Sequence, residues 1–213
     1  MTDVTTPQRT DTELVGEARA GDEQAFAELV RRHERRVYNL AYRMLGRSED
    51  ARDASQEAFV SCYRNLRRFR GDSAFGTWLH RIAVNACYDL LRKRPRDQVE
   101  LNEGLAEATV GDPADRAASA VDVQRALLEV PHEFRAVIVM RDVQGLPYDE
   151  IAAVLAVPVG TVKSRLHRGR VALGVALAAE ARSSRRLREP DAGTAPSKRS
   201  TAKAARTGRR PSS

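Results

Sequence analysis

The stretch that decides the fold is residues 160–170, which read GTVKSRLHRGR and follow the stretch YDEIAAVL at residues 148–155. A short break, AVP, separates the two stretches at residues 156–158. Within residues 160–170 the positions Val162, Leu166 and Gly169 recur at spacings of four and three, which is the spacing of one face of an α-helix. The sequence therefore predicts a helix, a turn and a second helix.

The second predicted helix carries hydrogen-bond donors on its other face, namely Lys163, Ser164, His167 and Arg168. Such a face suits the major groove of DNA, where base edges offer acceptors between two rows of phosphates. An ordinary solvated basic face has the same composition, so this helix alone leaves both interpretations open. The preceding helix favours DNA binding, because its Ile151, Val154 and Leu155 supply the apolar side that holds a recognition helix at the surface.

The composition predicts helices and a polyanionic partner. Only 5% of the 213 residues are aromatic, which disfavours a sheet and fits one or two helical domains. The net charge of +7 is unevenly distributed. Residues 181–213 hold ten basic and two acidic side chains, whereas residues 97–115 hold six acidic and no basic ones. Much of the positive charge therefore belongs to the tail, and the folded part must place its own positive charge locally.

Periodicity and breakers divide the chain into two small helical domains joined by a flexible linker, an all-α fold. Residues 1–10 are expected to be disordered. Residues 11–95 form the first domain. Asp11 or Thr12 is expected to cap its first helix and Asp22 its second, and two further helices are expected from after Ser48 to about Phe69 and from Thr77 to about Lys93. An acidic linker at 96–118 leads to the second domain at 119–181, whose last helix is expected to end near Ala181. Residues 182–213 form a basic disordered tail.

The sequence offers no pattern for catalysis or for a cofactor. We find no carboxylate pair, nucleophile with a base, phosphate loop or zinc spacing, so no catalytic residue, metal or cofactor is expected. Cys62 and Cys87 are predicted to be buried free thiols in a reducing cytosol. The longest apolar run is too short to span a bilayer and the N-terminus lacks a signal-peptide core, so we expect a cytoplasmic protein.

Residues 67–78, which read RRFRGDSAFGTW, form a loop with clustered arginines, two glycines and aromatic side chains. One interpretation is a turn whose Phe75 and Trp78 plug the core. The other is a pocket for an unstacked base, which needs a hydrogen-bonding wall, a stacking wall and nearby cations for phosphates. Composition alone favours the plug.

Two stretches together carry a family resemblance: residues 70–75 with 77–85, and residues 159–168. They resemble the signatures of bacterial RNA polymerase sigma factors of the sigma-70 family, extracytoplasmic-function (ECF) subfamily. Their order and the gap between them also match, and the resemblance covers residues 11–178. It reverses the preference for a simple plug in the loop.

The resemblance implies that the first domain separates the promoter strands at the minus-ten element and holds a base of the non-template strand. The positions that match are Arg70, Gly71, Asp72, Ser73, Ala74, Phe75, Trp78, Arg81 and Asn85. It also implies that Asp53, Gln56 and Glu57 dock on the clamp helices of the largest subunit of core RNA polymerase. The second domain would read the minus-35 element as duplex, through Thr161, Lys163, Ser164, Arg165, His167 and Arg168.

The partners implied by the resemblance are RNA polymerase core, promoter DNA and an anti-sigma factor, with no small-molecule substrate. In the family the linker threads the active-site cleft and the RNA exit channel. The six carboxylates could occupy that basic channel until RNA displaces them. A solvated linker is the simpler alternative.

Some features depart from the family pattern. Gly169 stands where alanine is usual, and Gly174 follows it. Each glycine is expected to destabilise the recognition helix by about 1 kcal/mol. Gly76 leaves the shape of the base pocket open. The tail either adds salt-sensitive DNA affinity or is a solvated extension without a role.

Two other classes of protein compete with this interpretation. A stand-alone helix-turn-helix regulator would use the same second domain, but it has no need of residues 70–85. An enzyme with an appended DNA-binding domain needs catalytic residues that the first 96 positions do not show.

Overall fold

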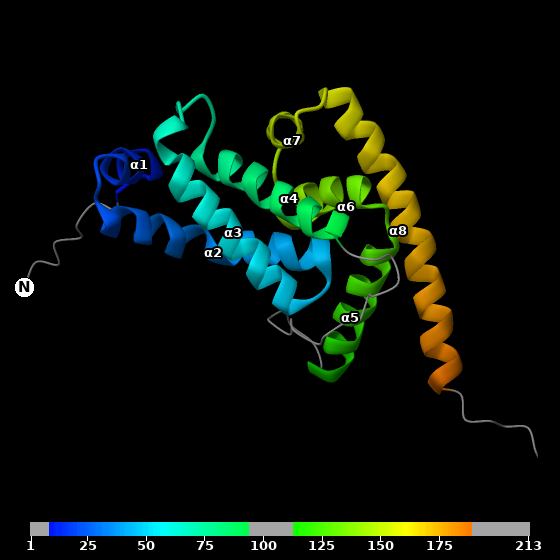
Figure 1. The fold of residues 1–213 in the computed structure, drawn as a ribbon. Coiled ribbons are helices and arrows are strands. Elements are labelled where there is room, and N and C mark those ends of the chain that lie inside the picture. Colours follow the sequence, from blue (N-terminus) through cyan, green and yellow to red (C-terminus); the bar gives the residue numbers. More distant parts are fainter. Residues whose placement is uncertain (1–8, 94–112, 189–213) are drawn as a thin grey trace, which may run out of the picture.

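The structure is a computed structural model that describes residues 9–93 and 113–188. In these two ranges every regular element is helical, as expected for an all-α fold (Figure 1). The first range holds α1 (Asp11–Arg19), α2 (Glu23–Leu45), α3 (Ser48–Asn65) and α4 (Phe75–Lys93). The second holds α5 (Pro113–Glu129), α6 (His132–Ile138), a π-helical turn (Val139–Val143), α7 (Tyr148–Leu155) and α8 (Val159–Arg188).

Polar caps begin the first two helices. Thr10 caps α1 in a capping box, in which its hydroxyl accepts from the Glu13 amide at 3.3 Å and the Glu13 carboxylate accepts from the Thr10 amide at 2.6 Å. The expected cap at Asp11 or Thr12 was therefore wrong, because Glu13 reciprocates with Thr10. Asp22 caps α2 as predicted, accepting from the amides of Gln24 and Ala25.

Several helix boundaries differ from the prediction. Helix α3 ends at Asn65, and a 3₁₀ turn at Leu66–Arg68 replaces its expected last turn. Helix α5 begins at Pro113, inside the predicted linker, and α8 continues to Arg188, beyond Ala181. Three predicted segments lie partly outside the described residues: residues 96–112 of the predicted linker, residues 1–8 of the predicted N-terminal segment and residues 189–213 of the predicted tail.

The two halves of the chain pack against each other. Helix α4 lies against α7, and α2 lies against α5 and α6, as Figure 1 shows. Gly46 ends α2 in the left-handed conformation at φ 81°, and a Cβ atom there would lie 2.4 Å from Leu128 Cδ1 of α5. Only glycine combines this φ with such a close approach. The expected pair of helical domains is thus joined by a packed interface as well as by a linker.

Arg135 of α6 is the buried charge of this interface, with 7% of its surface exposed. Its guanidinium donates to the Met44 carbonyl at the end of α2 and to the carbonyls of Leu128 and Val130 at the end of α5. Burial lowers the pKa of Arg135 to about 10. The side chain joins two helix ends whose last carbonyls have no partner within their own helices.

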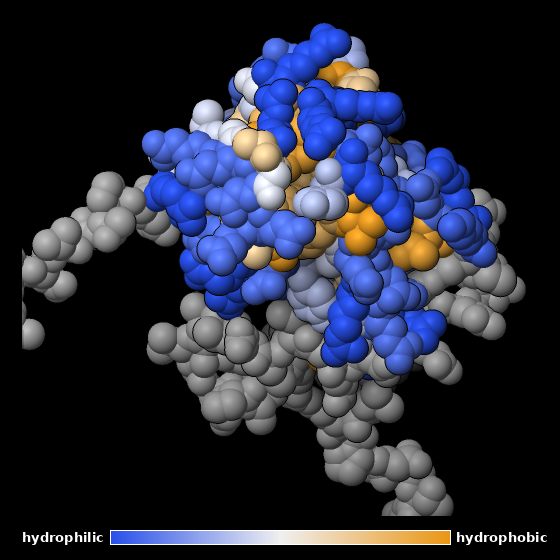
Figure 2. All heavy atoms as spheres, turned by 60° about the vertical axis from the view of Figure 1, so that its left-hand side comes forward, coloured by the Kyte–Doolittle hydropathy of each residue, from blue (hydrophilic) through white to orange (hydrophobic). Residues whose placement is uncertain are grey.

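Cys62 and Cys87 are free and buried, which confirms that part of the prediction. Burial raises the pKa of each thiol to about 12, so neither is a reactive thiolate near neutral pH. Among the described helices, none combines the length and hydrophobicity needed to cross a membrane. The face in Figure 2 is mostly hydrophilic, with hydrophobic atoms visible only in small patches.

Candidate nucleic-acid interface

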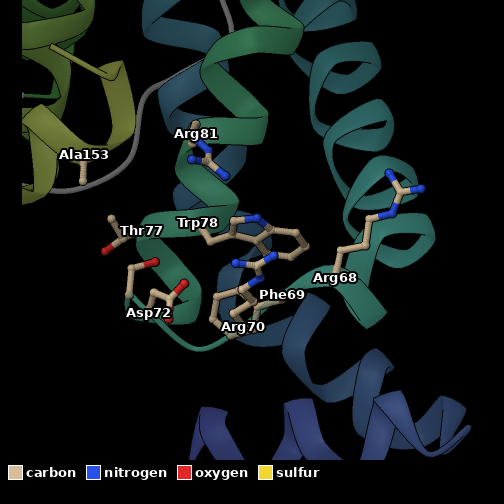
Figure 3. A pocket seen from close by; sticks show the side chains of 9 residues that line it. Arg68, Phe69, Arg70, Asp72, Thr77, Trp78, Arg81 and Ala153 are labelled. Atoms are coloured by element: carbon tan, nitrogen blue, oxygen red, sulfur yellow. The ribbon is translucent and has the colours of Figure 1, made fainter.

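A cavity of about 420 Å³ opens beside the loop that joins the 3₁₀ turn to α4. Figure 3 shows the rings of Phe69 and Trp78 with the Arg70 side chain in its wall, Arg68 on one side and Ala153 of α7 on the other. The residues that line the cavity are Arg68, Phe69, Arg70, Asp72, Ser73, Thr77, Trp78, Arg81 and Ala153. The cavity therefore combines aromatic faces, guanidinium groups and short polar side chains, which is what an unstacked nucleotide requires.

Three aromatic rings pack together beside this cavity, and two of them, Phe69 and Trp78, line it. Phe69 and Trp78 lie with ring centroids 5.0 Å apart, and Phe75 packs edge-on to Phe69 at 6.1 Å. Phe75 also contacts the ring of His33 from α2 at 5.3 Å. The half-buried Trp78 keeps part of its ring toward the cavity, whereas Phe75 is only 5% exposed.

The predicted minus-ten residues divide into two groups. The structure brings together Arg70, Asp72, Ser73, Trp78 and Arg81 around the cavity. It does not place the other four at the cavity wall, namely Gly71, Ala74, Phe75 and Asn85. Of these, Gly71, Ala74 and Asn85 are exposed and Phe75 is a core residue. Phe75 is thus a plug, as the first interpretation expects, whereas Trp78 lines a cavity, as the second interpretation requires.

Four lining residues were absent from the predicted site. Arg68 and Phe69 could have been found, since they belong to the same arginine and aromatic run as Arg70. Thr77 and Ala153 could not have been found from the sequence, because only the packing of α7 on α4 brings them together. The sequence did not determine how Gly76 affects the pocket. A Cβ atom at this position would lie 3.4 Å from His33 Cε1, and Gly76 does not line the cavity.

The helix pair α7–α8 has the predicted geometry. Val162 and Leu166 are buried, and the opposite face of α8 exposes Lys163, Ser164, His167 and Arg168. Thr161 and Arg165 are half-buried. The turn between the helices runs through Ala156, which adopts the left-handed conformation at φ 52°. This turn sets α8 at the surface with these four side chains exposed, where a DNA groove could reach them.

The sequence predicts only that Gly169 destabilises α8. The structure shows that Gly169 also has a packing role. A Cβ at this position would lie 2.9 Å from Ile138 Cδ1 and 3.1 Å from Phe134 Cβ, both on α6. The missing side chain lets α6 and α8 approach closely. Gly174, in contrast, has nothing within 4 Å of its built Cβ.

These two glycines give a matched pair of substitutions on one helix. We expect Gly174→Ala to raise the free energy of unfolding by about 1 kcal/mol, because alanine is the better helix former. We expect Gly169→Ala to lower it by about 1 kcal/mol, since the added methyl group overpacks the contact with α6. Urea denaturation of both variants measures the difference. Equal stabilisation by both would mean that the α6–α8 contact is looser than described.

The predicted polymerase-docking residues Asp53, Gln56 and Glu57 are all exposed on α3. Their spacing places them on one face of the helix, opposite the buried Ala51, Ala54 and Ala58. Within residues 9–93 and 113–188, no group of three or more His, Cys, Asp or Glu side chains is arranged to hold a metal ion.

Comparison with known proteins agrees with this geometry. Residues 29–97 match the family Sigma-70 region 2, and residues 120–173 match Sigma-70, region 4. Over 166 residues the chain is 43% identical to the ECF RNA polymerase sigma factor SigM of Mycobacterium tuberculosis, covering 78% of this chain and 84% of that relative. It is 42% identical over 159 residues to the ECF sigma factor SigE of Mycolicibacterium smegmatis, covering 70% of this chain but only 62% of that relative's length.

A solved structure shares the arrangement as well. CnrH, determined in complex with the cytosolic domain of CnrY, superposes with a TM-score of 0.63 at 30% identity, covering 79% of this chain and 97% of CnrH. The two family matches define the class, a sigma-70 type protein with regions 2 and 4. Within that class, the chain belongs to the ECF RNA polymerase sigma factors. This membership favours a sigma factor over a stand-alone helix-turn-helix regulator.

Proposed function

We propose that this protein directs RNA polymerase core to promoters and opens the DNA strands there by capturing an unpaired base in the cavity beside α4. The observation that carries the proposal is the joint presence of two different DNA-binding surfaces on one chain. One is a pocket with aromatic and guanidinium walls, and the other is an exposed helix-turn-helix face. A regulator that binds only duplex DNA needs only the helix-turn-helix face.

The pocket suits strand opening because it stabilises only DNA that is already unpaired. A flipped base would stack near Phe69 and Trp78, whose rings lie 5.0 Å apart, while Asp72 and Ser73 offer hydrogen-bonding groups at the rim. Arg70 and Arg81 would neutralise the adjacent phosphates. Unpairing costs a few kcal/mol, and binding the unpaired form offsets that cost without any chemical step. The protein itself then acts as a binding factor, not as an enzyme.

The face of α8 would read duplex DNA at the minus-35 element. Lys163, His167 and Arg168 supply donors for base edges and phosphates, and Ser164 keeps its hydroxyl near the start of the helix, where it donates to the Thr161 carbonyl at 3.0 Å. The half-buried Arg165 lies near Tyr88 of α4, close enough for its charge to lower the pKa of that phenol against the dominant effect of burial. It is less available for DNA than the four exposed residues.

Two protein partners complete the proposal. The exposed carboxylates and amide of Asp53, Gln56 and Glu57 would dock on the clamp helices of the largest polymerase subunit. An anti-sigma factor would bind across both halves of the chain and keep it from polymerase. The complex of CnrH with the cytosolic domain of CnrY supports a partner of this kind, because CnrH is similar to this chain across both halves. We also propose that the protein works in the cytoplasm, where polymerase and promoters are.

Reconstitution with purified core polymerase tests the function. We expect the full chain to co-purify with core and to support transcription from promoters selected out of a random library. Arg70→Ala should lower transcription about tenfold by weakening strand opening, and Lys163→Ala should lower it about tenfold by weakening duplex binding. Permanganate reactivity of unpaired thymines separates the two, since only Arg70→Ala is expected to reduce opening on complexes that have already formed.

The matched control is Arg19→Ala, which removes an exposed arginine of α1 that lies outside both surfaces. This variant should transcribe like the parent protein. Absence of core binding by the parent chain, or equal loss of transcription in all three variants, would contradict the proposed function.

A further inference from the structure

The contact between α4 and α7 falls on the side of α4 that carries the base pocket. We propose that α7 is an intramolecular latch, which occupies this side of α4 through Glu150 and Ala153 and competes there with single-stranded promoter DNA. The inference rests on the proposed function, because the DNA it excludes is the ligand of that pocket. It adds a regulatory step that belongs to the free chain and needs no second protein.

Two contacts bring the latch to the pocket. The Thr77 hydroxyl donates to Glu150 Oε2 at 2.8 Å, and Thr77 is 6% exposed. Ala153, one turn further along α7, lines the same cavity as Thr77, Arg70 and Arg81. Figure 3 shows Ala153 on the α7 ribbon beside Thr77. One wall of a cavity that otherwise belongs to residues 68–81 is thus supplied by the other half of the chain.

The charge of Glu150 opposes the proposed ligand. The cavity is lined by the guanidinium groups of Arg68, Arg70 and Arg81, which suit a phosphate. A carboxylate hydrogen-bonded to a lining residue brings negative charge to the same rim, and like charges repel across short distances. The closed form therefore disfavours DNA both by covering part of the wall and by its charge.

A second patch joins α5 to α2, and so one half of the chain to the other, at residues that do not line the cavity. Gln124 of α5 donates to the Tyr42 carbonyl at 3.3 Å and accepts from Arg43 at 3.0 Å, and Leu128 covers Gly46. These groups lie at the C-terminal end of α2, whereas the latch lies on α4 (Figure 1). Weakening this patch should loosen the contact between the two halves and so open the latch. A variant in this patch therefore tests the latch without changing any residue that could contact DNA in the cavity.

The recognition face of α8 is not covered in the same way. Lys163, Ser164, His167 and Arg168 are all exposed in the closed form. The latch should therefore lower affinity for single-stranded DNA while affinity for duplex DNA is unchanged. Only molecules in the open form bind single strands. The apparent dissociation constant for single strands is therefore the intrinsic constant divided by the fraction of molecules that are open.

The test uses the full chain without polymerase. The probe is a fluorescent single strand selected from a random pool by the protein bound to core polymerase, and its duplex form is the comparison. We expect Glu150→Ala to tighten single-strand binding about tenfold and to leave duplex binding unchanged. Asp149→Ala is the matched control: it removes the same charge from an exposed position of the same helix, and should change the affinity less than about twofold.

Gln124→Ala is the second variant, because it is uncharged and distant from the cavity. We expect it also to tighten single-strand binding, and to lengthen the distance between fluorophores attached at positions 19 and 174. The latch is rejected if Glu150→Ala and Gln124→Ala bind single strands like the parent, or if Asp149→Ala tightens binding as much as Glu150→Ala. In those cases polymerase-dependent strand opening by the parent chain would still support the proposed function. Loss of that opening would instead contradict the function itself.

Discussion

Replacing Arg135 by alanine should lower the free energy of unfolding by about 3 kcal/mol, the largest effect that we expect from a single substitution in this chain. The guanidinium is 7% exposed and donates to carbonyls of Met44, Leu128 and Val130. Its removal leaves buried acceptors without donors at two helix ends, and water cannot reach them while the interface stays closed. Urea denaturation followed by circular dichroism measures the loss.

Two control variants separate charge from geometry at this position. Arg135→Lys keeps the positive charge but has one nitrogen in place of the guanidinium fork, so we expect roughly half of the loss. Arg125→Ala removes an exposed arginine of the neighbouring α5 and should change stability by less than about 0.5 kcal/mol. If Arg135→Ala is no more destabilising than Arg125→Ala, the guanidinium does not hold the two halves together.

Lowering the pH from about 6.5 to about 4 should cost about 3 kcal/mol of stability through His80 alone. His80 is 5% exposed on α4, and its pKa falls from 6.5 to about 4 because of burial, with smaller effects of His33 and Arg36. In the unfolded chain His80 takes up a proton as the pH falls through about 6.5, whereas in the folded chain it stays neutral until about pH 4. Between these values the unfolded state binds more protons, so stability falls as the pH falls.

Denaturation at several pH values checks this assignment. His80→Gln should remove most of that pH dependence, because glutamine does not titrate. His167→Gln is the matched control, since His167 is exposed on α8 and its loss should leave the slope unchanged. A slope that persists in His80→Gln would assign the acid sensitivity to other groups.

Much of the fold could be predicted because its signals are local. Asp22 and Gly46 delimit α2, since a capping side chain and a left-handed residue act within one helical turn. The α7–α8 pair follows from the spacing of Val162 and Leu166, and the loop from its arginines and glycines. The cap of α1 was missed by one or two positions, because Thr10 caps the helix through its reciprocal contact with Glu13.

The candidate site could be predicted only in part. Arg70 and Trp78 were found because a base pocket needs cations and stacking faces close together in the chain. Phe75 was assigned to DNA contact, but its side chain is buried against His33 and Phe69. The choice between a ring that lines a pocket and one that supports it depends on helices α2 and α4 together, and no local pattern records that contact.

The sequence by itself determined an all-helical chain and predicted two candidate DNA-binding surfaces, because helical periodicity, caps and short motifs are properties of neighbouring residues. Only the tertiary structure decided how the halves meet. Glu150 reaches Thr77 across 73 positions, Arg135 reaches Met44 across 91, and Gly169 is shaped by Ile138 of another helix. Such contacts depend on the shapes of whole packed surfaces, so the packing of α7 on α4 beside the cavity becomes visible only once the chain is folded.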